Sequence, residues 1–89
     1  MQVYGYVYDA NGYHGPKVEF EGTPKNMANF IMFHMKDAVV ITDEIDQFIV
    51  SSTQGGFLDR VYSPEMRDQI LKEILPLQLG DEEAFNPVI

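Results

Sequence analysis

The 89-residue sequence contains no cysteine and no tryptophan, and its six lysine and arginine residues are outnumbered by fourteen aspartate and glutamate residues. Without cysteine, the chain can have neither disulfide bonds nor a thiolate nucleophile, and it lacks the sulfur ligands that most structural zinc sites use. The lack of cysteine fits a protein of the reducing cytoplasm, and we expect that location.

Positive charge is scarce and scattered. The net charge is −8, and the cations occur singly, at Lys17, Lys25, Lys36, Arg60, Arg67 and Lys72. Because phosphate backbones are bound by clustered cations, we expect no direct binding to nucleic acid. An acidic surface also repels anionic lipids, and no apolar run approaches the ~20 residues of a membrane span. The sequence therefore predicts a protein partner or a homodimer rather than nucleic acid or membrane.

Sequence signatures of catalysis and of metal binding are missing. His14 and His34 have no nucleophile motif beside them, and residues 43–47 ("DEIDQ") lack the alternating ligands and central glycine of a calcium loop. His34 is better interpreted as a hydrogen-bonded, partly buried histidine, and "DEIDQ" as a solvated turn. We expect no enzymatic activity, no cofactor and no metal.

Strict alternation marks the first strand. Val3, Gly5 and Val7 point to one side, and the opposite side carries Tyr4, Tyr6 and Tyr8. Asn11-Gly12 suits a turn with a left-handed residue, after which a strand returns to about Gly22. Pro16 cannot donate to a β-ladder, so this return strand should lie at an edge or carry a bulge. Together the two strands predict a hairpin.

Two helix starts follow a capping pattern. Thr23 precedes Pro24, and Ser63 precedes Pro64, so each hydroxyl can accept a first-turn N–H. We expect the first helix to reach about Lys36, although residues 30–35 could instead form a strand, and the second to end at Pro76. On the first helix, the predicted buried face consists of Met27, Ala28, Phe30, Ile31, His34 and Met35. Lys25, Asn26, Asn29 and Lys36 should lie opposite, with Phe33 among them and Met32 at the margin.

Between these helices, residues 38–42 and 47–53 are predicted to be strands that form a second hairpin or a crossover pair. The first of them should be either covered on both faces or central in the sheet. Residues 57–62 form either a fifth strand or a packed loop. The order β-β-α-β-β-α predicts an α+β two-layer sandwich, a four- or five-stranded, mainly antiparallel sheet with both helices on one face. Residues 1–80 should form this single domain, and the acidic segment 81–89 should be a mobile tail.

Two binding hypotheses follow. In the first, the chain is a small acidic, non-catalytic protein-interaction module, of an accessory or regulatory kind, that binds a partner or itself. Its surface would comprise Tyr4, Tyr6, Tyr8, Met32 and Phe33. In the alternative, the loop in "SSTQGGFLDR" (51–60) binds a small ligand or an anion through Ser52, Thr53, Gly55, Gly56 and Arg60. The favoured interpretation of the two glycines is a structural corner, because glycine lets the backbone turn sharply.

Overall fold

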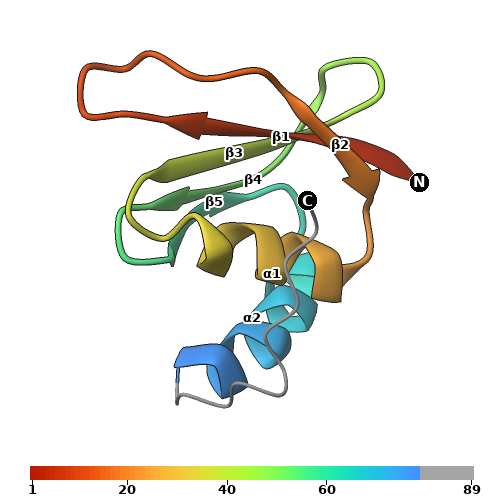
Figure 1. The fold of residues 1–89 in the computed structure, drawn as a ribbon. Coiled ribbons are helices and arrows are strands. Elements are labelled where there is room, and N and C mark those ends of the chain that lie inside the picture. Colours follow the sequence, from red (N-terminus) through yellow and green to blue (C-terminus); the bar gives the residue numbers. More distant parts are fainter. Residues whose placement is uncertain (79–89) are drawn as a thin grey trace.

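In a computed structural model that describes residues 1–78, five strands form one antiparallel sheet in the order β2-β1-β3-β4-β5. Both helices lie on the same side of this sheet (Figure 1). The two-layer α+β sandwich is therefore confirmed, and residues 57–62 supply a fifth strand. The predicted tail 81–89 lies outside the described residues. The elements are β1 (Gln2–Tyr8), β2 (Val18–Glu21), α1 (Pro24–Phe33), β3 (Ala38–Asp43), β4 (Phe48–Thr53), β5 (Phe57–Val61) and α2 (Pro64–Gln78).

The first hairpin forms as its sequence predicts. Strand β1 pairs with β2 on one side and with β3 on the other. In the turn, the Asp9 Oδ1 atom accepts the N–H groups of Asn11 (2.9 Å) and Tyr13 (3.0 Å), while Gly12 adopts a φ of 84°. Strand β2 is an edge strand, as the lack of an N–H at Pro16 suggested.

Both helix caps are confirmed. The Thr23 Oγ1 atom accepts the N–H of Asn26 at 3.1 Å, and the Ser63 Oγ atom accepts the N–H of Met66 at 3.1 Å. Each bond satisfies one of the first-turn donors that has no partner inside the helix. The caps thus fix where the two elements of the helical layer begin.

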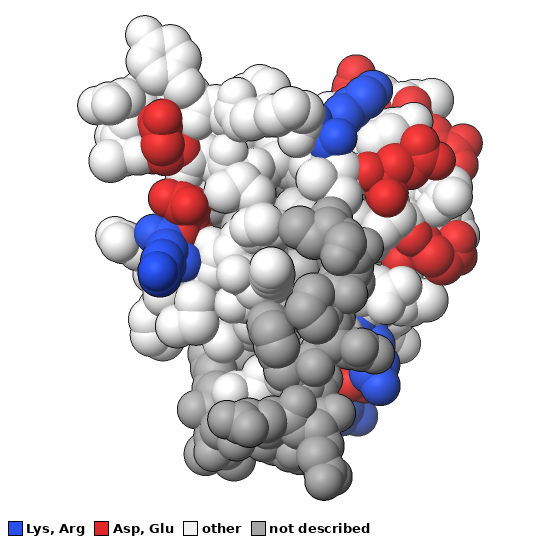
Figure 2. All heavy atoms as spheres, in the orientation of Figure 1, with Lys and Arg blue, Asp and Glu red and all other residues white. Residues whose placement is uncertain are grey.

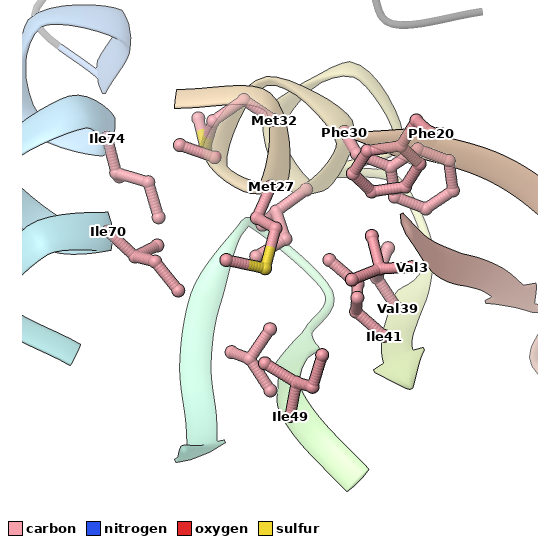
Figure 3. Close-up of a cluster of buried hydrophobic side chains, with 13 residues drawn as sticks. Val3, Phe20, Met27, Phe30, Met32, Val39, Ile41, Ile49, Ile70 and Ile74 are labelled. Carbon is pink, nitrogen blue, oxygen red and sulfur yellow. The ribbon is translucent and has the colours of Figure 1, made fainter. Parts of the chain in front are cut away.

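The predicted burial of the first helix is wrong at several positions. Asn29 and Met32 are only 2% and 6% exposed, whereas Met35 is 44% exposed. Helix α1 packs on α2, and its Phe30 ring packs on the sheet at Gly5 and Phe20, so two sides of the helix are buried instead of one. Figure 3 shows Met27 and Met32 on the side that faces Ile70 and Ile74 of α2.

The predicted ends of both helices are also wrong. Helix α1 stops at Phe33, where the C-cap His34 donates its N–H to the Phe30 carbonyl oxygen, so Met35 leaves the helical periodicity. Helix α2 continues through Pro76 to Gln78. Proline removes one hydrogen bond there, but Leu77 in the same last turn packs against the core and offsets this loss. Among residues 1–78, no helix has the length and apolar character needed to cross a bilayer.

Strand β3 is the central strand, as predicted for residues 38–42, and its inward side chains Val39 and Ile41 are fully buried. The turn that follows is closed by the Asp43 Oδ1 atom, which accepts the N–H groups of Ile45 and Gln47 at 2.9 Å each. The core lies between this side of the sheet and the helices (Figure 3). Within residues 1–78, the other side of the sheet carries no helix (Figure 1).

Candidate binding surface

The tyrosines of β1 lie on the uncovered side of the sheet, opposite the buried Val3 and Gly5, as predicted. Their cross-strand neighbours on β3 are Thr42, Val40 and Ala38, which pair with Tyr4, Tyr6 and Tyr8 in that order. All six side chains are half-buried although no helix covers them. We call this side, with Phe48 and Ser51 of β4 and Arg60 of β5, the uncovered face.

The loop between β1 and β2 adds two further side chains to this face. The His14 ring stacks on Tyr6 with a centroid distance of 5.2 Å and also contacts Tyr8 at 5.1 Å. The Lys17 Nζ atom lies 4.2 Å from the centre of the Tyr4 ring, a cation–π arrangement. Sequence reasoning missed both residues. Their places in the hairpin after the tyrosine strand were the available signal, but their ring contacts depend on how the loop folds back.

A hollow of about 420 Å³ lies on the uncovered face over β3 and β4. It forms because small side chains, Ala38 and Ser51, lie between large ones. The pairing of Val40 with Ser51 and of Ser51 with Arg60 sets this arrangement across three strands. The hollow is lined by Tyr8, Ala38, Val39, Val40, Phe48, Ser51, Ser52, Thr53, Asp59 and Arg60.

Arg60 stands on the rim of the hollow. Its guanidinium carbon lies 5.5 Å from the centre of the Phe48 ring. A bulge in β5 leaves Asp59 without a cross-strand partner and places it on the same rim. Within the described part of the chain, no carboxylate lies within 4.0 Å of the Arg60 guanidinium, and the Met1 ammonium with Glu21 forms the one ion pair there. The Arg60 guanidinium therefore contacts an aromatic ring and forms no ion pair within residues 1–78.

The Gly55-Gly56 pair is the turn between β4 and β5. Both residues have positive φ angles, 97° and 79°, which glycine adopts without steric cost. The Gly55 N–H donates to the Met35 carbonyl oxygen at 2.6 Å, and the Gly56 N–H donates to the Thr53 carbonyl oxygen at 3.1 Å. Since both amides are occupied, they do not form an open anion cradle. The predicted ligand loop is split. Thr53 and Arg60 line the hollow, whereas the Ser52 side chain is buried and its Oγ atom has no hydrogen-bond partner among residues 1–78. Gly56 packs against Met32 of α1, and Gly55 packs against Phe57.

Met32 and Phe33 are separated from the tyrosines. A Cβ atom on Gly56 would lie 2.7 Å from the Met32 Sδ atom, so this buried side chain packs under the turn and belongs to the core. Its placement on an interaction surface was wrong, because the second packing side of α1 was not foreseen. Phe33 is 39% exposed, as predicted, and its ring lies 4.9 Å from that of His34. Both residues belong to the helical layer, so they do not extend the uncovered face.

His34 differs from its predicted state. Its Nε2 atom is buried and has no hydrogen-bond partner in residues 1–78, so it is not a satisfied histidine. Its ring packs against Phe30 at 4.7 Å. Burial lowers the pKa of His34 below the usual 6.5, and the nearby Asp37 carboxylate opposes this shift. The ring is therefore held in its neutral form at neutral pH.

Many acidic side chains gather at one end of the sheet, and others lie on the opposite side of the view (Figure 2). Asp9 and Asp37 line a depression at the Ala38 end of β3. Asp43 and Glu44 line one depression together with Met1, and Glu21 pairs with the Met1 ammonium group. Among residues 1–78, no three histidine, aspartate or glutamate side chains lie close enough together to hold a metal ion. The hollow lies at the other end of β3, near Ala38.

Comparison with protein-family models, with curated proteins and with solved structures finds no match. The uncovered face is therefore the basis of the functional proposal.

Proposed function

We propose that this chain is a small, acidic, non-catalytic protein-interaction module of an accessory or regulatory kind, and that it binds a partner protein or a second copy through the uncovered face. The observation that carries the proposal is the row of Tyr4, Tyr6 and Tyr8 on the side of the sheet without helices. Tyrosine is enriched at protein interfaces because it combines a large apolar ring with a polar tip.

The packing of the row also supports binding. The Tyr6 ring is stacked against His14, and the Tyr4 ring lies under Lys17, so these side chains are already held in place before a partner arrives. A preorganised surface loses less side-chain entropy on binding than a mobile one. A protein partner is favoured over nucleic acid by the net charge of −8. The proposal includes a cytoplasmic location, which the absence of cysteine supports.

Photo-crosslinking tests the proposed surface. Tyr6 is replaced by p-benzoyl-phenylalanine in one protein, and Lys72, exposed on α2, is replaced in a matched control. We expect a crosslinked product from position 6 and none from position 72, either in a lysate of the native host or, for self-association, in the purified protein. Equal crosslinking from both positions, or none from position 6, would contradict the proposal.

A second candidate function is the binding of a small ligand or anion. It is favoured by the hollow, whose volume of about 420 Å³ lies in the range of ligand sites and whose lining includes Arg60 and Thr53. A thermal-shift screen with a metabolite panel tests it, because a ligand at 100 times its Kd stabilises the fold by about 2.7 kcal/mol. A panel without any shift, together with crosslinking from Tyr6, would exclude this alternative.

A further inference from the structure

On the uncovered face, the hollow lies next to Arg60, which has no carboxylate within 4.0 Å among the residues described. We propose that this hollow anchors a partner segment in which an aromatic side chain is adjacent to a carboxylate, with the ring over Ala38 and Ser51 and the carboxylate at Arg60. This inference rests on the proposed function and specifies the chemistry of the partner.

The first observation is the shape of the hollow, which suits an aromatic side chain of the partner. Ala38, Val40 and Ser51 form its floor, and Tyr8 and Phe48 stand on either side. The floor is formed by small side chains and the walls are aromatic, an arrangement that suits a flat apolar group. Anchor residues of protein interfaces are most often aromatic side chains seated in such pockets.

The second observation is the set of contacts that the Arg60 guanidinium makes. Its guanidinium group lies over the Phe48 ring and has no carboxylate within 4.0 Å among residues 1–78. Arginine binds carboxylates in a planar, two-pronged geometry and retains its charge when partly buried. Asp59 on the same rim is a like charge that repels the carboxylate of an acidic segment. A carboxylate beside the anchor ring would therefore lie on the Arg60 side of the hollow.

The third observation is the distance between the hollow and the acidic side chains around it. Asp43 lies five residues along β3 from Ala38, which at about 3.3 Å per residue is a distance of ~17 Å. Charges beyond the Debye length of about 8 Å are largely screened at physiological ionic strength. The closer acids are Asp59 on the rim and Asp9 and Asp37, which line a neighbouring depression together with Tyr8 and Ala38. The carboxylate of the partner must therefore lie on the Arg60 side of the hollow, away from Asp9 and Asp37.

The test uses NMR titration of the ¹⁵N-labelled full chain with acetylated, amidated hexapeptides. The first probe is Gly-Asp-Glu-Phe-Gly-Ser, and two matched probes replace either the two acids by lysine or the phenylalanine by alanine. We expect the first probe to shift the amide signals of Ala38, Val40, Ser51 and Arg60, and each matched probe to bind about tenfold more weakly or not at all.

Protein variants complete the test. Arg60→Gln should weaken the first probe about tenfold, and Arg67→Gln, exposed on α2, should not change its affinity. Ala38→Leu should fill the hollow and abolish the shifts, and Asp59→Asn should strengthen binding about twofold. Unchanged affinity in Arg60→Gln, equal binding of the lysine probe, or no shift with any probe would overturn the inference.

Two further outcomes separate the hypotheses. Free phenylacetate binding as tightly as the peptide would overturn the protein-segment proposal and favour a small-ligand site. Crosslinking from position 6 without peptide binding would overturn only the anchor chemistry, whereas failure of both would overturn the proposed function as well.

Discussion

The two sides of the sheet are made of the same five strands but are stabilised differently. On the covered side, Val3, Val39 and Ile41 are fully buried beneath the helices. On the uncovered side, the neighbouring residues Tyr4, Val40 and Thr42 are half-buried, and large rings are held by other rings and by cations. The free energy of folding thus comes mainly from the covered side. The residues on the uncovered side are less constrained by the core and are available for binding.

The sharpest comparison uses the same substitution on both sides. Phe30→Ala should lower the free energy of unfolding by about 3–5 kcal/mol, because this ring is fully buried and its removal leaves a cavity. Phe48→Ala should cost only about 1–2 kcal/mol, because the Phe48 ring is half-exposed. Urea denaturation measures both values. Equal losses would mean that the uncovered face is as essential to the fold as the core.

Two glycines in different surroundings, Gly5 and Gly15, give the second comparison. A Cβ atom on Gly5 would lie 2.4 Å from the Phe30 Cζ atom, so Gly5→Ala should destabilise the protein by about 1–3 kcal/mol through overpacking. Gly15 has no atom within 4 Å of the same position, and Gly15→Ala should change stability by less than about 0.5 kcal/mol. Thermal melts of both variants decide. A neutral Gly5→Ala would show that the helix can move away from the sheet.

The third prediction concerns the N-caps of the two helices in the helical layer. Thr23→Ala and Ser63→Ala should each cost about 0.5–2 kcal/mol, because each leaves a first-turn N–H without its acceptor. Thr53→Ala is the control: Thr53 is exposed and makes only a long bond of 3.4 Å to Phe57, so its loss should be smaller. If the denaturation midpoint is the same for all three variants, the caps contribute nothing beyond ordinary surface contacts.

The smallest effect should be a pH dependence on the covered side. The pKa of His34 is lowered by burial, so below pH 6.5 the unfolded chain binds more protons at this residue than the folded chain does. The free energy of unfolding should therefore fall as the pH decreases from 6.5 toward the folded pKa. Denaturation of the wild type and of His34→Gln between pH 7.5 and 5.5 measures this contribution. An identical pH dependence in both proteins would contradict it.

Local signals were enough to predict much of the fold. The alternation of Val3 and Tyr4 gave the two sides of β1, and the hydroxyls of Thr23 and Ser63 gave both helix starts, because strand period and capping depend on adjacent residues. Asn29 and Met32 were misplaced because an amphipathic reading assumes one buried side, whereas α1 contacts both the sheet and α2. Pro76 was misread because its local cost is offset by the packing of Leu77.

The candidate site could be predicted only in part. The tyrosine row follows from one strand, so sequence reasoning found it. The hollow combines Tyr8, Ala38, Ser51 and Arg60 from four strands, and their proximity depends on the register of three strand pairs. The bulge in β5 brings Asp59 to the same rim as Arg60, and no local sequence pattern predicts this shift in strand register. Of these four residues, sequence reasoning had named only Tyr8 and Arg60, and it had placed them on two separate candidate sites.

The position of β1 between β2 and β3 also has a consequence for the order of folding. Every other strand pair joins neighbours in the sequence, but β1 and β3 pair residues that are about 30 to 40 positions apart, such as Tyr8 with Ala38 and Val3 with Asp43. Local hairpins close within microseconds, whereas a distant pairing must first overcome the entropy of a long loop. We expect the hairpin β1–β2 and the meander β3–β4–β5 to form early as separate units, and the joining of β1 to β3 to limit the folding rate.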